Sequence, residues 1–137
     1  MNDRFKFRIF IKNESNPKYN GMFKVHSLHL GTNKAIISSQ HGNVSIKLDS
    51  NKILMQSTGL KDKNGTLIYE GDCLGGIYEG LYIHWCNECK QFQLKARDYG
   101  CTACEGDIHW YEVVEDNNKL EVTGNVYENK RLLDERN

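Results

Sequence analysis

The sequence predicts an all-β protein with mainly antiparallel strands, and three features indicate this class. Short stretches rich in β-branched and aromatic residues recur along the chain. Turn residues separate these stretches at intervals of about 8–12 residues, the spacing typical of antiparallel sandwiches and barrels. Patterns with helical periodicity are scarce. The length of 137 residues suits one domain, or two small subdomains that share a core.

The first predicted strand covers residues 4–11, where apolar and basic side chains alternate. Phe7 and Ile9 fall on one face, while Lys6 and Arg8 fall on the other. Such a strand can lie on a core with its basic face in solvent, or its rings can stack on single-stranded nucleic acid. We favour the core interpretation. Further strands are expected at residues 22–30, 35–38, 44–48, 52–55, 67–69, 73–78, 81–85, 91–94, 110–114 and 120–122.

The clearest turn is Asp62-Lys63-Asn64-Gly65. Asn-Gly tolerates the positive φ angles of a tight type I′ turn, so we expect a hairpin here. Helical patterning is confined to the tail, where residues 127–136 predict one short helix with Asn125 as a candidate N-cap.

The formal net charge is zero, but the two halves of the chain carry opposite charges. Residues 1–68 hold 11 Lys and Arg against 4 Asp and Glu, a net charge of +7. Residues 69–137 hold 7 against 14, a net charge of −7. The halves can pack on each other, within one chain or between copies, and the basic half can face nucleic acid. Alternatively, these charges only cover solvent-exposed faces.

The sequence favours a cytoplasmic protein with no membrane partner. No apolar stretch approaches the ~20 residues of a membrane span. The first six residues lack the apolar region of a secretory signal. Cys73 lies in a strand-like stretch, where a small apolar role is expected.

Four cysteines form a candidate metal site. Cys86, Cys89, Cys101 and Cys104 have the spacing C-x₂-C-x₁₁-C-x₂-C, and four thiolates suit a tetrahedral, closed and therefore structural Zn²⁺ site. The two pairs converge only if residues 90–100 reverse direction, because a straight strand of that length would hold them ~30 Å apart. The alternative is a set of unligated cysteines at two turns. A thioredoxin-like role is disfavoured, since neither pair opens a helical pattern.

No motif of the sequence indicates an enzyme active site. The chain has no GxSxG, P-loop or GxGxxG sequence, and its five histidines lack the HExxH arrangement. We therefore expect no catalytic residues, no bound organic cofactor and no small-molecule substrate. An enzyme of unfamiliar type is the alternative.

Two stretches resemble the YopX family, whose members are encoded by phages and integrated prophages. They are residues 54–72, LMQSTGLKDKNGTLIYEGD, and residues 122–133, VTGNVYENKRLL. The chain departs from the family pattern at three positions. Ser57 stands where an aromatic residue is usual, Cys73 where Ile or Val is usual, and Lys130 where Pro is usual.

The resemblance implies an N-terminal β subdomain, residues 1–53, and a barrel-like C-terminal subdomain, residues 54–137. The cysteine-rich insertion at residues 86–104 is not part of the family pattern. The family has no known activity, so the resemblance implies structure alone. We expect a non-enzymatic phage or prophage accessory protein that acts by macromolecular binding, through a protein partner or self-assembly. The alternative partner is nucleic acid, bound by the basic N-terminal half.

The cysteine spacing generates a testable prediction. Protein kept reduced should carry one equivalent of Zn²⁺ by elemental analysis. Cys101→Ser should release the metal and speed amide exchange in residues 86–109, because residues 95–109 hold little apolar material, while residues 54–72 keep their protection. Zinc well below one equivalent would show that these cysteines hold no metal.

Overall fold

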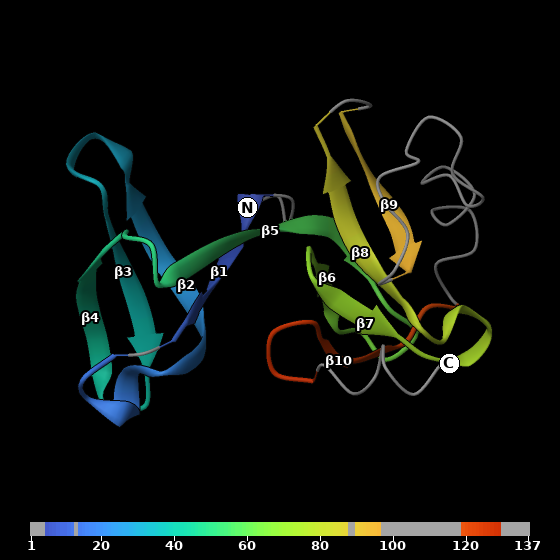
Figure 1. Cartoon of the computed structure of the whole chain (residues 1–137), viewed down its shortest axis with the longest axis horizontal. Coiled ribbons are helices and arrows are strands. Elements are labelled where there is room, and N and C mark those ends of the chain that lie inside the picture. Colours follow the sequence, from blue (N-terminus) through green and yellow to red (C-terminus); the bar gives the residue numbers. More distant parts are fainter. Residues whose placement is uncertain (1–4, 13, 88–89, 97–118, 130–137) are drawn as a thin grey trace.

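A computed structural model describes residues 5–12, 14–87, 90–96 and 119–129. These residues form two antiparallel sheets, with strand orders β4-β3-β2-β1-β5-β6 and β10-β7-β8-β9 (Figure 1). The strands are β1 (Phe7–Ile11), β2 (Gly21–His29), β3 (Lys34–Ser39), β4 (Gly42–Lys47), β5 (Lys52–Lys61), β6 (Leu67–Tyr69), β7 (Asp72–Leu74), β8 (Leu81–Cys86), β9 (Gln91–Ala96) and β10 (Val122–Asn125). Short 3₁₀ turns are η2 (Pro17–Tyr19), η3 (Leu30–Thr32) and η4 (Gly76–Tyr78). The predicted all-β class is confirmed.

The N-terminal sheet is built on the alternation seen in the sequence. Ile9 and Ile11 of β1 are 0% and 1% exposed and pack with Ile37 of β3 in one apolar cluster. The register places Ile9 opposite Phe23 of β2, so both strands turn their apolar side chains to the same core. Partly buried residues of β2 and β4 complete this cluster. The core interpretation of the first strand is confirmed.

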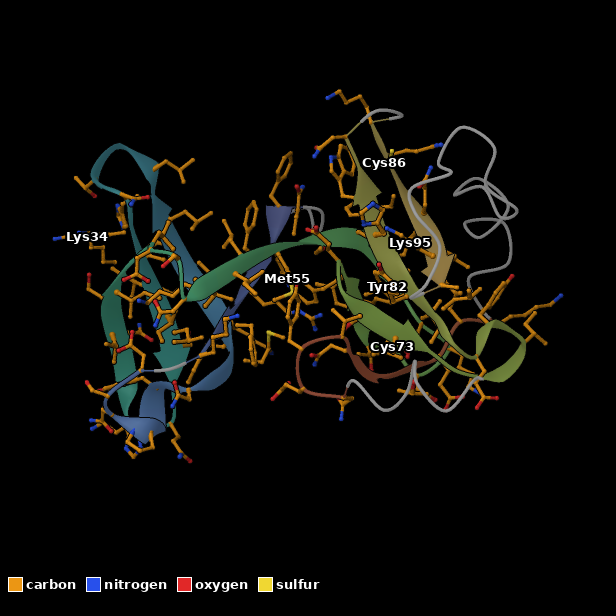
Figure 2. All side chains as sticks on the ribbon, in the orientation of Figure 1. Lys34, Met55, Cys73, Tyr82, Cys86 and Lys95 are labelled. Carbon is orange, nitrogen blue, oxygen red and sulfur yellow. The ribbon has the colours of Figure 1, made fainter. Side chains whose placement is uncertain are left out.

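Strand β5 belongs to both halves of the molecule and joins them (Figure 1). Its first part pairs with β1, where Lys52 lies opposite Ile11. Its last part pairs with β6, and the register shifts between Ser57 and Lys61. Gly59 takes a φ of +83° within this irregular stretch, which lets the strand bend. Met55, near the middle of β5, lies between the two sheets (Figure 2). The expected boundary after residue 53 therefore falls inside a continuous strand.

The C-terminal sheet packs around a second apolar cluster of Ile68, Leu74, Ile83 and Leu120, each 0–2% exposed. Strands β10 and β9 stand at its two edges. Within the described residues this sheet stays open, so the predicted barrel-like form is not confirmed. The predicted strand at residues 110–114 lies outside the described part of the chain.

The predicted tail helix is described only at its beginning. Asn125 accepts the backbone N–H groups of Tyr127 and Glu128 at 3.0 and 2.9 Å through its side-chain oxygen. Its backbone carbonyl accepts the N–H of Asn129 at 2.9 Å. This is the geometry of an N-cap, as the sequence predicted. Residues 130–137 lie outside the description, and the helix itself stays a prediction.

The turn between β5 and β6 differs from the predicted type. A type I′ turn needs positive φ at both central residues, whereas within this turn only Gly65 has one, at +81°. Asp62 organises the turn instead. Its carbonyl accepts the N–H of Gly65 at 3.0 Å, and its Oδ1 accepts those of Asn64 and Thr66 at 2.9 Å. Its Oδ2 accepts the N–H of Val122 at 2.9 Å, which ties the turn to β10.

The ionisation of Asp62 generates a pH-dependent prediction. Burial raises the pKa of this carboxyl, but the backbone N–H donors together lower it below its ordinary value of 3.8. A lowered folded-state pKa stabilises the fold above the unfolded-state pKa, and this contribution is lost as the pH falls through the folded-state pKa. Asp62→Asn directs an NH₂ group at one of the backbone donors, so we expect a loss of about 1–3 kcal/mol at pH 7.

Urea unfolding at pH 7 and at several values below 4 measures this effect. The stability gap between the parent chain and Asp62→Asn should narrow at acid pH. Glu79→Gln, which neutralises an exposed carboxylate, is the matched control and should change stability by less than about 0.5 kcal/mol at neutral pH. If the difference in stability between the parent chain and Asp62→Asn stays constant with pH, the proposed role of the ionised Asp62 carboxylate is wrong.

Candidate binding cleft

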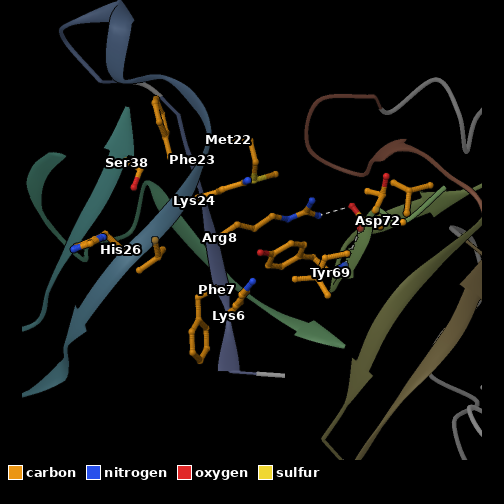
Figure 3. A pocket seen from close by; sticks show the side chains of 15 residues that line it. Lys6, Phe7, Arg8, Met22, Phe23, Lys24, His26, Ser38, Tyr69 and Asp72 are labelled. Atoms are coloured by element: carbon orange, nitrogen blue, oxygen red, sulfur yellow. Dashed lines mark hydrogen bonds and ion pairs between the residues drawn. The ribbon is translucent and has the colours of Figure 1, made fainter. Parts of the chain in front are cut away.

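A cleft of ≈ 790 Å³ lies where the two sheets meet (Figure 3). Strands β1 and β2 line one side of it. Residues 65–67, Tyr69, Asp72 and Val122 line the other side. Because both halves contribute to the cleft, its shape depends on how they are joined.

A buried ion pair joins the two sides. Arg8 Nη2 lies 2.7 Å from Asp72 Oδ1, and the two side chains are 12% and 2% exposed. Arg8 Nη2 also donates to the carbonyl of Glu70 at 3.1 Å. The guanidinium lies over the ring of Tyr69, 4.8 Å from its centroid. Asp72 Oδ2 in turn accepts the N–H of Tyr69 at 2.8 Å, so one carboxylate holds both the arginine and the turn (Figure 3).

Burial dominates the electrostatics of this junction. It raises the pKa of Asp72, and the Arg8 guanidinium lowers it by less. Burial also raises the pKa of Glu70. The pKa of Tyr127 is raised by burial and further by the nearby Glu70 carboxylate. Arg8 Nε is buried and has no hydrogen-bond partner among the described residues. The pair is therefore held in one geometry, but not all of its buried polar atoms have a hydrogen-bond partner.

The two signature stretches meet directly beside this ion pair. Gly71 has a φ of +88°, and a Cβ built there would lie 3.2 Å from Met55 Sδ and 3.3 Å from Tyr127 Cε2. The carbonyl of Gly71 accepts the N–H of Val126 at 2.9 Å. The ring of Tyr127 stacks on Phe10 of β1 at 5.3 Å between centroids. Only glycine combines this backbone angle with this close approach.

The outward surface of the N-terminal sheet is basic. Strands β1 to β4 contain no Asp or Glu. A row of directly opposed residues crosses all four strands: Arg8 faces Lys24, Lys24 faces Ser38, and Ser38 faces Asn43. By alternation these side chains lie on the face opposite the apolar core. Arg8 and Lys24 line the cleft, so this row leads into it (Figure 3).

A second pair of cations lies on the same face, further along the strands. Lys34 of β3 faces Lys47 of β4 directly, and both are exposed. We call the surface of Arg8, Lys24, Ser38, Asn43, Lys34 and Lys47 the outer basic face. Like charges directly opposite each other on neighbouring strands destabilise a sheet. Arg8 is compensated by Asp72, whereas the described residues place no acidic group within ion-pair distance of Lys24.

The candidate zinc ligands are described only in part. Cys86 ends β8, is 1% exposed, and its carbonyl accepts the N–H of Lys90 at 2.9 Å. Cys89, Cys101 and Cys104 lie outside the described residues. Among the residues that the structure does describe, no three His, Cys, Asp or Glu side chains gather as metal ligands. The zinc site therefore stays a prediction.

Cys73 has the environment of an apolar residue. It is 1% exposed, and burial, with a smaller contribution from Asp72, raises the pKa of its thiol to about 11. The thiol is therefore protonated at neutral pH and is a poor nucleophile.

Sequence reasoning missed the ion pair and the cation pairs. It placed Arg8 on the face of β1 opposite the apolar side chains and did not link it to Asp72. The partners lie far apart in the chain, and no spacing signal links them. The opposition of Arg8 and Lys24 depends on strand register, which the alternating pattern alone leaves open.

Comparisons with known proteins identify the family. The model of the family described as "YopX protein" matches residues 6–134. The solved structure titled "Crystal structure of protein EF1440 from Enterococcus faecalis" is similar, with a TM-score of 0.53 and 25% sequence identity. The similarity covers 93% of this chain and 96% of that one. No curated protein matches. In the described part of the chain, no helix has the length and apolarity to cross a membrane. The chain belongs to the YopX family.

Proposed function

We propose that this chain is a non-enzymatic accessory protein of a phage or prophage that acts in the bacterial cytoplasm by binding another macromolecule. The outer basic face and the adjoining cleft form the binding surface. The observation that carries this proposal is the direct opposition of two exposed cations, Lys34 and Lys47, with the exposed Lys24 on the same face of strands that contain no acidic residues.

This arrangement has an energetic consequence. A directly opposed pair of like charges costs about 0.2–1 kcal/mol relative to a neutral pair, by analogy with measured cross-strand energies. An acidic partner on the outer basic face would offset that cost by neutralising Lys34 and Lys47 together. The concave cleft beside the face adds a surface that a partner can fill.

Three acidic or thiol side chains, one that lines the cleft and two that adjoin its lining residues, are engaged in the structure or buried. Asp72 is engaged by Arg8 and by the Tyr69 N–H. Asp62 accepts backbone N–H groups at its turn. Cys73 is buried, and its thiol pKa is raised to about 11. These engagements favour a role in binding over a role in catalysis.

Titration with a defined heparin fragment, used as a polyanion probe at ~50 mM salt, tests the proposal. Lys24→Gln and Lys34→Gln should each weaken binding by about threefold to tenfold, because each removes a cation that faces the polyanion. Lys95→Gln is the matched control, since Lys95 also lies on an antiparallel strand but in the other sheet. It should bind like the parent chain.

Two results would overturn the proposal. One is the absence of heparin binding at this salt concentration. The other is an equal loss in Lys95→Gln, which would place the interaction outside the outer basic face. Thermal unfolding of each variant controls for loss of the fold.

A further inference from the structure

We infer that the macromolecule bound by the outer basic face is a single-stranded nucleic acid. This inference rests on the proposed function and names its partner. Three features support it: the different directions in which the cations of the outer basic face point, an exposed aromatic residue that directly precedes two residues of the cleft, and the row of polar side chains that crosses the sheet.

The cations of the N-terminal sheet point in different directions. Arg8 and Lys24 point from β1 and β2 toward Asp72 and the cleft (Figure 3). Lys34 extends from the far side of the same sheet, away from the second sheet (Figure 2). Duplex DNA stays straight over ~150 base pairs, so a duplex would contact one end of this surface but not follow it. A single strand is flexible enough to contact both Lys24 and the Lys34–Lys47 pair.

One exposed aromatic residue near the cleft offers a ring on which a base could stack. Phe5 is 54% exposed and directly precedes Lys6 and Phe7, which both line the cleft. A ring next to backbone-binding cations is the combination by which proteins hold single strands without reading their sequence. An acidic protein segment would use the cations but gain little from an exposed phenylalanine at this position.

The polar row adds neutral donors between the cations and the edge of the sheet. Lys24, Ser38 and Asn43 lie directly opposite one another on β2, β3 and β4. Strand spacing of about 4.8 Å sets the distance between successive side chains. Hydroxyl and amide groups commonly donate to phosphate oxygens beside lysine and arginine. A phosphate backbone laid across the strands would therefore meet a donor at each step.

Fluorescence anisotropy with a labelled 15-nucleotide oligo-dT tests the inference. Affinity should fall with salt, with a log–log slope of about −0.7 for each phosphate contact. The double variant Lys34→Gln/Lys47→Gln should reduce the magnitude of that slope by about 1.4, since two contacts are lost. Phe5→Ala should weaken binding at least about fivefold and leave the slope unchanged, because stacking releases no counterions. Lys95→Gln is again the control.

Two competitors distinguish binding of a single strand from binding of a duplex or of an acidic polypeptide. A blunt duplex of the same length should bind at least about tenfold more weakly than the single strand, and poly-glutamate of equal charge should also bind more weakly. Equal binding of either competitor, or no binding of oligo-dT, would overturn the inference. If heparin still binds through Lys24 and Lys34 in that case, the proposed function stands. The partner is then duplex nucleic acid if the duplex binds equally, and an acidic protein if poly-glutamate binds equally or oligo-dT does not bind. If heparin binding fails too, both proposals fall.

Discussion

The arrangement of this protein depends on one buried ion pair, Arg8 with Asp72. It connects a strand of the N-terminal sheet to the first residue of β7 in the C-terminal sheet. Burial raises the pKa of Asp72 more than the arginine lowers it, so the pair is not a strong net source of stability. Its effect is on geometry. Neither charge can be left unpaired at this depth, so the two halves must meet in the one arrangement that brings them together.

The family signature can be understood from this constraint. Gly71 allows the chain to pass between Met55 and Tyr127, and so places Asp72 within reach of Arg8. Met55 and Gly71 come from the first signature stretch and Tyr127 from the second, so both stretches serve the same junction. The departure at Cys73 is an apolar exchange inside the core, since that thiol is buried and protonated. The outer basic face lies outside both stretches, which separates the shared architecture from the proposed binding surface.

Local features of the fold were predictable from the sequence, and long-range ones were not. The alternation in β1 predicted its buried face, and Asn125 was identified as a cap, because both signals lie within a few residues. The Asn64-Gly65 turn was located but assigned the wrong type. The Asp62 side chain accepts hydrogen bonds from backbone N–H groups of the turn and of β10, and this sets the turn conformation. The length of β5 was underestimated at four residues, because its last part pairs with β6 through a register shift between Ser57 and Lys61 that interrupts the alternating pattern. The cleft could not be predicted, because the partners of Arg8 are fixed by strand register and tertiary packing.

A double-mutant cycle on Arg8 and Asp72, measured by urea unfolding, tests most directly whether this pair fixes the two halves. Arg8→Met keeps the apolar stem, and Asp72→Asn keeps an acceptor for the Tyr69 N–H. Arg8→Met alone leaves a buried carboxylate unpaired, so it should destabilise the fold by about 3–5 kcal/mol. The double variant should lose at least about 2 kcal/mol less than the sum of the single losses. Losses that add to within about 0.5 kcal/mol would show that the two residues are independent and would contradict this account.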